Sequence, residues 1–307
     1  MKMSSMQLES LPNEILLEIF SYMTMQELLQ YGQISKRIRV ICSDKSFWKR
    51  IYLVQKKVKA EFIKFILERN CYLLVIDDTV IDGSVRLNKT SELAYLEVFC
   101  HATKDFYREL LNSYCSLEFL KMDSMDNSLN IVFQNLCNRN GQTLRCLSLA
   151  ECRWISKKSI QVISEHCTQL TEINLWCTYI SQDAMDSFIS GVSPNVEKVC
   201  LGSNLGTITD KQIEKLVSRC NRITELDISD TKLTNASITS VIKHLKESLV
   251  YLDIRNITKI SFEKVLELKS MSKLGVLNYG FKSWHTMALR KKLPLLRVNP
   301  EDGYGHF

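Results

Sequence analysis

The chain repeats one short hydrophobic pattern along most of its length. Apolar residues recur in the order apolar-x-x-apolar-x-apolar, for example at Leu144, Leu147 and Leu149. Alternation of this kind predicts a short strand with one buried face. A degenerate copy is predicted over residues 293–298, and a regular repeat over so many copies indicates a stacked array rather than one spherical core. The eight clear copies follow at steps of 24 to 27 residues and begin at Leu93, Leu117, Leu144, Leu170, Val196, Ile223, Leu249 and Leu274.

A helix is predicted after each strand. Helical spacing of apolar residues follows the turn, as at Ile213, Leu216 and Val217. A Ser or Thr precedes these segments, and its side-chain oxygen can accept a hydrogen bond from an unpaired backbone N–H at the start of a helix. The predicted helix caps are Ser156, Ser181, Thr209, Thr234 and Ser261, and Thr209 with Gln212 spells a capping box.

The cysteines follow the same register. Cys167 and Cys220 each fall three residues before a strand pattern, and Cys152 falls eight residues after the start of its own. Thr178 and Asn204 take the place of Cys152 in the next two repeats, and we expect small or polar residues to fit that corner. The pattern resembles the cysteine-containing leucine-rich repeat. The resemblance implies an α/β solenoid, with parallel strands on the inside of an arc and helices outside.

Composition favours a reduced, intracellular protein in the cytoplasm or the nucleus. The 307 residues are 45% hydrophobic, with 10 Gly and 4 Pro, which is typical of an ordered chain. The cysteine count of 11 is odd, and the sequence contains no Cys-x-x-Cys pair and no hydrophobic signal segment at its start. No apolar run approaches the roughly 18–20 residues that cross a membrane, so we expect no membrane partner.

A different segment precedes the repeats. Residues 8–53 predict short helices: one opened by Leu11-Pro12, one by a capping box at Thr24, and one capped by Asp44 that carries Phe47, Trp48 and Ile51. Such a small bundle cannot bury this many large apolar groups among its own helices. An exposed apolar patch is therefore predicted, and such a patch usually marks a partner-binding surface.

The residues of this segment resemble an F-box. The motif departs from the family pattern at Ser35 and Ile38. The quoted match is Leu11-Pro12-x-Glu14-Ile15-Leu16, Ile19-Phe20-Ser21-Tyr22, Leu28-Leu29, Ile34-Ser35-Lys36-Arg37 and Asp44-x-x-x-Trp48. The family implies binding to the small adaptor of an SCF ubiquitin ligase, and through it to a cullin. By carry-over, the residues expected at this contact or in its immediate support are Leu11, Pro12, Ile15, Phe20, Leu28, Ile34 and Trp48. The alternative is that Ile15, Ile34 and Trp48 pack the small core.

The whole chain is similar to the F-box and leucine-rich-repeat protein family, and most similar to its S-phase-kinase-associated branch. The resemblance divides the chain into an F-box over residues 8–53, a helical linker with an atypical first repeat over 54–92, about eight repeats over 93–298 and a C-terminal tail over 299–307. Within 54–92, residues 54–66 trace a helical face and 73–76 form the atypical strand. The family resemblance implies a substrate receptor for ubiquitination and degradation that has no catalytic residue and needs no cofactor. Its expected partners include cell-cycle regulators and an accessory recognition subunit.

Substrate contacts are expected on the inner face of the arc, where residues between the buried strand positions point. A large aromatic side chain in such a position is a typical binding anchor. The acidic residues Glu172, Glu225, Asp227 and Asp253 favour a basic peptide, whereas a C-terminal tail over residues 281–307 is a competing occupant. The predicted substrate-binding residues are Phe119, Trp176, Lys198, Tyr251 and Arg255.

Other functions are weaker interpretations. The formal charge of +6 is dispersed in short clusters without aromatic interleaving, so no nucleic-acid partner is expected. The pairs Cys100-His101 and His166-Cys167 are sequence neighbours that point in different directions, so neither is expected to catalyse ubiquitin transfer. No metal site with closely paired ligands is predicted. The main alternative function is a scaffold that uses the F-box outside a ligase. A third hypothesis is a repeat protein that inhibits an enzyme and whose N-terminal helical segment has decayed.

Overall fold

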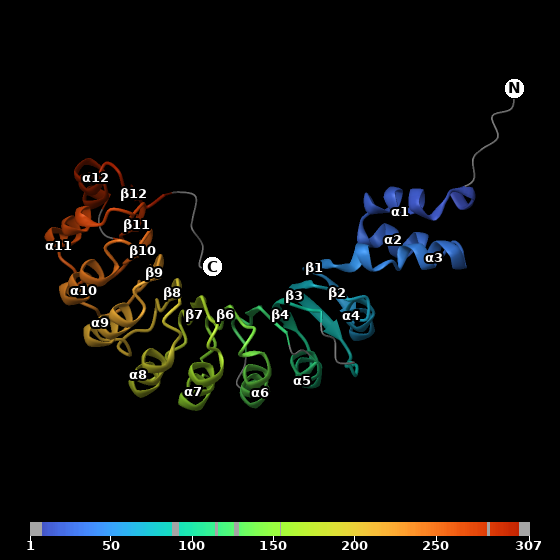
Figure 1. Ribbon diagram of the computed structural model, residues 1–307, viewed down its shortest axis with the longest axis horizontal. Coiled ribbons are helices and arrows are strands. Elements are labelled where there is room, and N and C mark those ends of the chain that lie inside the picture. The colour runs from blue at the N-terminus through green and yellow to red at the C-terminus, as the bar shows by residue number, and fades with distance from the viewer. Residues whose placement is uncertain are drawn as a thin grey trace, which may run out of the picture.

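The computed structural model describes residues 8–87, 92–113, 116–125, 129–153, 155–280 and 283–300. These residues form an arc with a small helical module at its N-terminal end (Figure 1). Strands line the inside of the arc and helices cover the outside (Figure 1). The strands of the described residues form one 12-stranded sheet whose pairings are all parallel, in the order β1-β3-β4-β5-β6-β7-β8-β9-β10-β11-β12 with β2 beside β3. The predicted α/β solenoid is confirmed.

From β4 onward, strands and helices alternate along the chain. The α-helices are α1 (Asn13–Ser21), α2 (Met25–Tyr31), α3 (Lys36–Cys42), α4 (Ala60–Leu67), α5 (Lys104–Asn112), α6 (Asn130–Asn140), α7 (Lys157–His166), α8 (Gln182–Gly191), α9 (Asp210–Arg219), α10 (Asn235–Leu245), α11 (Phe262–Leu266) and α12 (Ser283–Lys292). The strands are β1 (Arg50–Val54), β2 (Lys57–Lys59), β3 (Leu73–Asp82), β4 (Tyr95–His101), β5 (Phe119–Lys121), β6 (Cys146–Ser148), β7 (Glu172–Asn174), β8 (Lys198–Cys200), β9 (Glu225–Asp227), β10 (Tyr251–Asp253), β11 (Val276–Asn278) and β12 (Arg297–Val298). Short 3-10 helices occur at η1 (Leu8–Ser10), η2 (Lys45–Trp48) and η4 (Glu267–Ser270).

The middle residue of each short strand holds the register of the sheet. Leu147, Ile173 and Val199 pair in sequence with one another, and all three are fully buried. Burial of one such side chain contributes about 1.5–3 kcal/mol. The degenerate last copy differs from its prediction, because Val298 rather than Leu296 pairs with the middle residue Leu277. β12 is two residues long, and Val298 is its one buried residue.

The five predicted helix caps are confirmed. Ser156, Ser181, Thr209, Thr234 and Ser261 each accept a backbone N–H hydrogen bond at the start of α7 to α11. Thr209 and Gln212 form the complete capping box. A cap of this kind contributes about 1 kcal/mol, so the caps help to define where each helix starts.

Buried polar side chains close the corners after β6 and β8. Cys152 donates its thiol hydrogen to the Met122 carbonyl at 2.9 Å, across the repeat boundary. Asn204 likewise donates to the carbonyls of Leu175 and Leu201, at 2.8 and 3.0 Å. The prediction that a small or polar residue fits this corner is therefore confirmed, because the turn leaves carbonyl groups that need buried donors.

The end of the helical module differs from the prediction. Asp44 caps the short 3-10 helix η2 rather than a full helix, and Ile51 lies in the strand β1. The third α-helix is instead α3, capped by Ser35. The predicted helical face over residues 54–66 is split, because β1 (Arg50–Val54) and β2 (Lys57–Lys59) both pair with β3 and the helix begins only at Ala60. The sheet thus begins before residue 54, and the atypical strand β3 is longer than the predicted 73–76.

Trp48 joins the helical module to the arc. Its indole Nε1 donates to the Cys42 carbonyl at the end of α3, at 2.9 Å. Its ring packs edge-on against Phe65 of α4 with centroids 4.9 Å apart, and it is 1% exposed within the core of the arc. Phe47 contacts both that core and the separate core of the module. The two parts are therefore connected by a packed joint.

Parts of the chain fall outside this description. The predicted C-terminal tail over residues 299–307 is described only at Asn299 and Pro300, and residues 301–307 lie outside the described residues. The prediction that a tail over 281–307 covers the inner face therefore concerns, in large part, residues outside the description. Among the described residues, no helix has the length and apolarity needed to span a bilayer.

Replacing Trp48 by Ala is expected to destabilise the joint by about 3–5 kcal/mol, because a large side chain leaves a cavity and the Cys42 carbonyl loses its donor. Urea unfolding followed by circular dichroism measures the loss, and hydrogen exchange should localise it to residues 42–67. The matched control is Tyr72→Ala, which removes a 47% exposed aromatic ring beside β3. Equal destabilisation by both variants would contradict the role of Trp48.

Candidate functional site

An apolar stripe lies on the outer face of α1. Pro12, Ile15, Ile19 and Tyr22 follow one another at spacings of three and four residues, so they share one side of the helix. Ile15 is 43% exposed and Tyr22 85% exposed, whereas Phe20 on the opposite side is buried in the core of the module. We refer to these four residues as the apolar stripe. Apolar side chains arranged in this way on a small module indicate a protein partner.

The predicted adaptor contacts divide into exposed and buried residues. Pro12, Ile15 and Ile34 are exposed, Leu11 is half-buried against the core, and Phe20, Leu28 and Trp48 are buried. The exposed three are available for contact, and the buried three support the surface from beneath. The alternative that Ile15 and Ile34 pack the core is wrong, whereas Trp48 does pack a core. Further exposed apolar side chains on the module, which the predicted set omitted, are Ile19, Tyr22, Leu29, Tyr31 and Val40.

Helical spacing was the signal for the omitted residues on α1. Ile19 and Tyr22 lie four and seven residues after Ile15, on the side away from Leu16 and Phe20. A helical wheel therefore separates them from the core residues. The helices α2 and α3 are only seven residues long, so residue spacing does not separate their exposed apolar side chains from their buried ones.

Arg37 holds the start of α1 in place. Its guanidinium donates from Nη2 to the Leu11 carbonyl at 2.6 Å and to the Asn13 side-chain oxygen at 2.7 Å. These bonds connect α3 to the Leu11-Pro12 turn across 26 residues of sequence. The geometry of the turn therefore depends on a side chain that the predicted set of contacts did not include.

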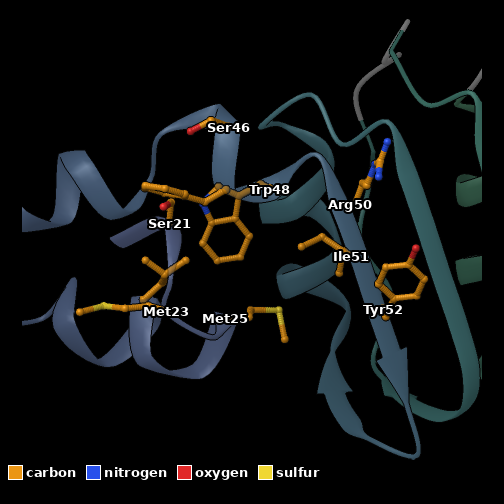
Figure 2. Close-up of a pocket in the computed structure, with 10 residues that line it drawn as sticks. Ser21, Met23, Met25, Ser46, Trp48, Arg50, Ile51 and Tyr52 are labelled. Atoms are coloured by element: carbon orange, nitrogen blue, oxygen red, sulfur yellow. The ribbon is translucent and has the colours of Figure 1, made fainter. Parts of the chain in front are cut away.

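A cleft of about 420 Å³ lies where the helical module meets the arc (Figure 2). Met23 and Met25 line it on the side of the module, whereas Ile51 and Tyr52 come from β1 (Figure 2). Trp48 lines this cleft, so the packed joint between the module and the arc also forms one of its walls. Tyr52, 59% exposed, pairs with Val75 and so extends the inner face of the sheet toward the module.

The first residues of the strands form a continuous row along the inner face, which we call the first row. Arg50 of β1 begins this row, and Leu73, Tyr95 and Phe119, which follow it, form what we call the aromatic shelf. The rings of Tyr95 and Phe119 are stacked, with centroids 3.9 Å apart and an interplanar angle of 6°. Burial and the neighbouring Glu97 carboxylate raise the pKa of Tyr95 to about 12, so it is neutral at physiological pH. The shelf thus offers a flat, uncharged surface.

The next part of the first row is charged. After Cys146, the residues Glu172, Lys198 and Glu225 occupy successive strands in register. The Lys198 Nζ lies 3.3 Å from a Glu172 oxygen and 3.5 Å from a Glu225 oxygen. Partial burial disfavours the ammonium, but the two carboxylates outweigh it and raise the pKa of Lys198. Lys198, predicted to meet a substrate, is therefore already engaged by two carboxylates of this chain.

Tyr251 and Arg255 belong to an internal network. Tyr251 is only 8% exposed, which corrects the expectation of a solvent-facing anchor. Its hydroxyl accepts a hydrogen bond from Asn278 at 2.7 Å and donates to Asp253 at 3.3 Å, so neighbouring strands cover it. Arg255 donates from Nε to both oxygens of the buried Asp253, at 3.0 and 2.9 Å. Burial and the Asp253 carboxylate also raise the pKa of Tyr251.

Trp176 lies in the turn after β7 rather than within the strand, which corrects its predicted position. It is half-buried, and its Cδ1 would lie 2.9 Å from a Cβ placed on Gly202 of the next repeat. Only a residue without a side chain leaves room for the indole there. Trp176 therefore packs onto the neighbouring repeat and exposes part of one side, whereas Phe119 stays in its strand as predicted.

The thiols are buried and weakly acidic. All ten cysteines of the described residues are free, and most are buried. Burial raises the pKa of Cys71 to about 12 and that of Cys220 to about 11. Burial also raises the pKa of Cys100 to about 11, although its sulfur lies 3.2 Å from the Tyr107 hydroxyl, which partly offsets the rise. Among the described residues, no three His, Cys, Asp or Glu side chains are grouped as metal ligands.

Sequence comparison identifies both parts of this architecture. Residues 62–302 match the SKP2 LRR domain, and residues 8–54 match the F-box-like family. The chain is a member of the F-box and SKP2-type leucine-rich-repeat family. The first match covers most of the arc, and the second covers the helical module with the apolar stripe.

Relatives and solved structures agree with this assignment. F-box/LRR-repeat protein 5 of Mus musculus is 27% identical over 207 residues, covering 67% of this chain and 29% of that protein. The Bos taurus protein of the same name is 25% identical over 231 residues, covering 75% of this chain and 32% of that protein. The chain thus spans about a third of the length of these relatives. The structure of the Rad7 and Elc1 complex in yeast matches with a TM-score of 0.54 and 17% identity over 94% of this chain and 91% of that chain, which shows the shared fold.

The thiol of Cys100 is expected to be unreactive at neutral pH. Because its pKa is raised to about 11, the thiolate that attacks an alkylating agent forms only near that pH. At pH 7.5 we expect iodoacetamide to label Cys100 at least about 100-fold more slowly in the folded chain than in urea. Mass spectrometry of the labelled peptides measures both rates. Labelling of Cys100 at the unfolded rate would instead indicate an activated thiol.

Proposed function

We propose that this chain is the substrate-receptor subunit of an SCF-type cullin-RING ubiquitin ligase. The observation that carries the proposal is an F-box whose apolar stripe is exposed and whose other end is packed, through Trp48, onto a leucine-rich-repeat arc. The F-box binds the small adaptor and through it a cullin. The inner face of the arc binds the protein substrate, with an accessory recognition subunit as a further partner.

In this proposal the chain acts by holding the substrate in a fixed position relative to the ligase scaffold. The adaptor complex holds the F-box, and the arc presents a substrate lysine to a ubiquitin-charged enzyme on the same scaffold. Holding two reactants close together and oriented lowers the entropic part of the barrier without any catalytic group from the receptor. A packed joint favours this role, because it fixes the direction of the inner face relative to the apolar stripe. The raised pKa of Cys100 also favours a receptor over an enzyme that carries ubiquitin on that thiol.

The finer parts of the proposal have separate support. The resemblance to the S-phase-kinase-associated branch of the family favours a cell-cycle regulator as substrate. Cysteines that pack as buried thiols favour a reducing compartment, the cytoplasm or the nucleus. The alternative is a scaffold that uses the adaptor without a ligase, and the partners retained by the F-box distinguish the two.

Charging the exposed apolar positions of the F-box is expected to abolish adaptor binding. The double variant Ile15→Asp with Ile34→Asp places two carboxylates where apolar contact is proposed, and we expect a loss of at least about 100-fold in affinity. Affinity purification from cells with quantitative mass spectrometry measures the retained adaptor and cullin. The matched control is Ile131→Asp, since Ile131 of α6 is 73% exposed and lies outside the F-box.

Three outcomes are informative. Adaptor and cullin retained by the native chain and the control, but lost from the double variant, would support the ligase receptor. Adaptor without cullin in all preparations would favour the scaffold. Equal retention by the double variant and the control would show that Ile15 and Ile34 are not at the interface.

A further inference from the structure

The first row along the inner face has two chemically distinct parts. The aromatic shelf of Leu73, Tyr95 and Phe119 is itself uncharged and lies over β3 to β5, with Arg50 before it in the row and the ion pairs of Lys121 with Glu97 and Asp123 beside it on β4, β5 and the turn that follows. Over β7 to β10 and the turns that follow them, the inner-face charges of the described residues are four carboxylates and two cations: Glu172, Glu225, Asp227 and Asp253 against Lys198 and Arg255. Asp227 and Asp253 are buried, so the part of this surface that carries excess negative charge is the first row, where Glu172 and Glu225 face the one ammonium of Lys198.

The carboxylates of the first row remain accessible. The side chains of Glu172 and Glu225 are each 28% exposed, and they share the single ammonium of Lys198. A carboxylate has two oxygens and about four acceptor positions, so each glutamate can accept an incoming guanidinium or ammonium besides Lys198. By contrast, Asp253 is fully buried and is bound by Arg255. The reachable acidic positions are therefore Glu172 and Glu225.

We propose that the inner face binds an extended basic segment of a protein substrate, with an aliphatic or aromatic residue on the aromatic shelf and an Arg or Lys at each of Glu172 and Glu225. This inference rests on the proposed function and names its class of substrate. Cys146, between the shelf and Glu172, is 9% exposed and leaves an uncharged floor for the residues that connect the two anchors.

The register of the sheet sets the spacing of the substrate motif. Neighbouring strands lie about 4.8 Å apart, and an extended chain advances about 3.3 Å per residue. Phe119 and Glu172 are two strands apart, and Tyr95 and Glu172 are three strands apart, because each pairs in register with the next. A segment that crosses the strands therefore needs its first basic residue about three or four positions after its apolar residue, and its second basic residue, at Glu225, about three positions after the first.

Removing the charge of Lys198 should change the affinity for a basic segment and for an acidic segment in opposite directions. A basic segment competes with Lys198 for the two glutamates, so removing the ammonium should strengthen its binding. An acidic or phosphorylated segment would need Lys198, so the same change should weaken its binding. Lys198→Gln therefore separates the two kinds of partner.

Fluorescence anisotropy on the full chain, purified with its adaptor, tests this with labelled synthetic peptides. The probe is a Gly/Ser peptide with one Leu, an Arg four residues later and a second Arg three residues after that. The comparison peptides replace both Arg by Glu, replace the Leu by Ser, or move both Arg two residues toward the Leu. We expect the probe to bind at least about tenfold more tightly than each of them, and more weakly as salt increases.

The variants locate the site. Glu172→Gln with Glu225→Gln should reduce probe affinity by at least about tenfold, whereas the matched control Glu197→Gln, at the exposed residue before β8, should not change it. Lys198→Gln should raise the affinity by about threefold to tenfold. Phe119→Ala should remove the preference for Leu over Ser while keeping the preference for Arg over Glu. A chain that ends at Pro300 should bind the probe as the full chain does.

The opposite results overturn the proposal. Tighter binding of the Glu peptide, or a loss of probe binding in Lys198→Gln, would assign an acidic partner. A large gain on removal of residues 301–307 would make the chain's own C-terminal segment the occupant. Failure of the probe to bind while the adaptor is retained would refute this inference and leave the proposed function standing. Binding of the probe by a chain that retains no adaptor would refute the proposed function and leave this inference standing.

Discussion

Each strand-and-helix unit of this chain buries its apolar face only against the next unit, and the rest of the structure depends on that constraint. The middle strand residues, such as Ile173 and Val199, are fully buried because each lies between two neighbouring repeats. The stability of the arc is therefore spread along the array as contacts between neighbours. The same stacking brings the first strand residues into one row, so the inner face is a direct product of the burial that holds the arc together.

Buried polar groups make the stacking specific. Stacking alone would tolerate many apolar side chains, but the corners after β6 and β8 expose carbonyl groups to the interior. Asn204 satisfies two of them, and Cys152 satisfies one in the preceding repeat. A buried carbonyl without a donor costs about 1–3 kcal/mol, so these residues favour one register over its alternatives. Cys152 therefore has a structural role in its corner.

The joint at Trp48 connects two surfaces that have different chemistry. On one side, the apolar stripe of α1 is suited to the burial of aliphatic and aromatic groups by a partner. On the other side, the first row includes the aromatic shelf and continues with Glu172 and Glu225, which suit a charged, extended segment. Because Trp48 contacts both α3 and α4, the distance between these surfaces is held by packing. The function proposed for the chain needs a connection of this kind between its two binding surfaces.

The sequence by itself determined the periodic part of this protein. Strand positions, the caps from Ser156 to Ser261, and the small or polar corner residues could all be predicted, because each follows from local hydrogen bonding and from a register that recurs every 24 to 27 residues. The F-box segment was recognisable for the same local reason. Tertiary structure decided what periodicity does not encode. It placed β1 in the sheet, buried Tyr251 beneath its neighbours, paired Lys198 with two glutamates and exposed Ile15 and Ile34. These features depend on which side chains from distant repeats meet, and burial and ion pairing at such contacts are settled only when the repeats stack.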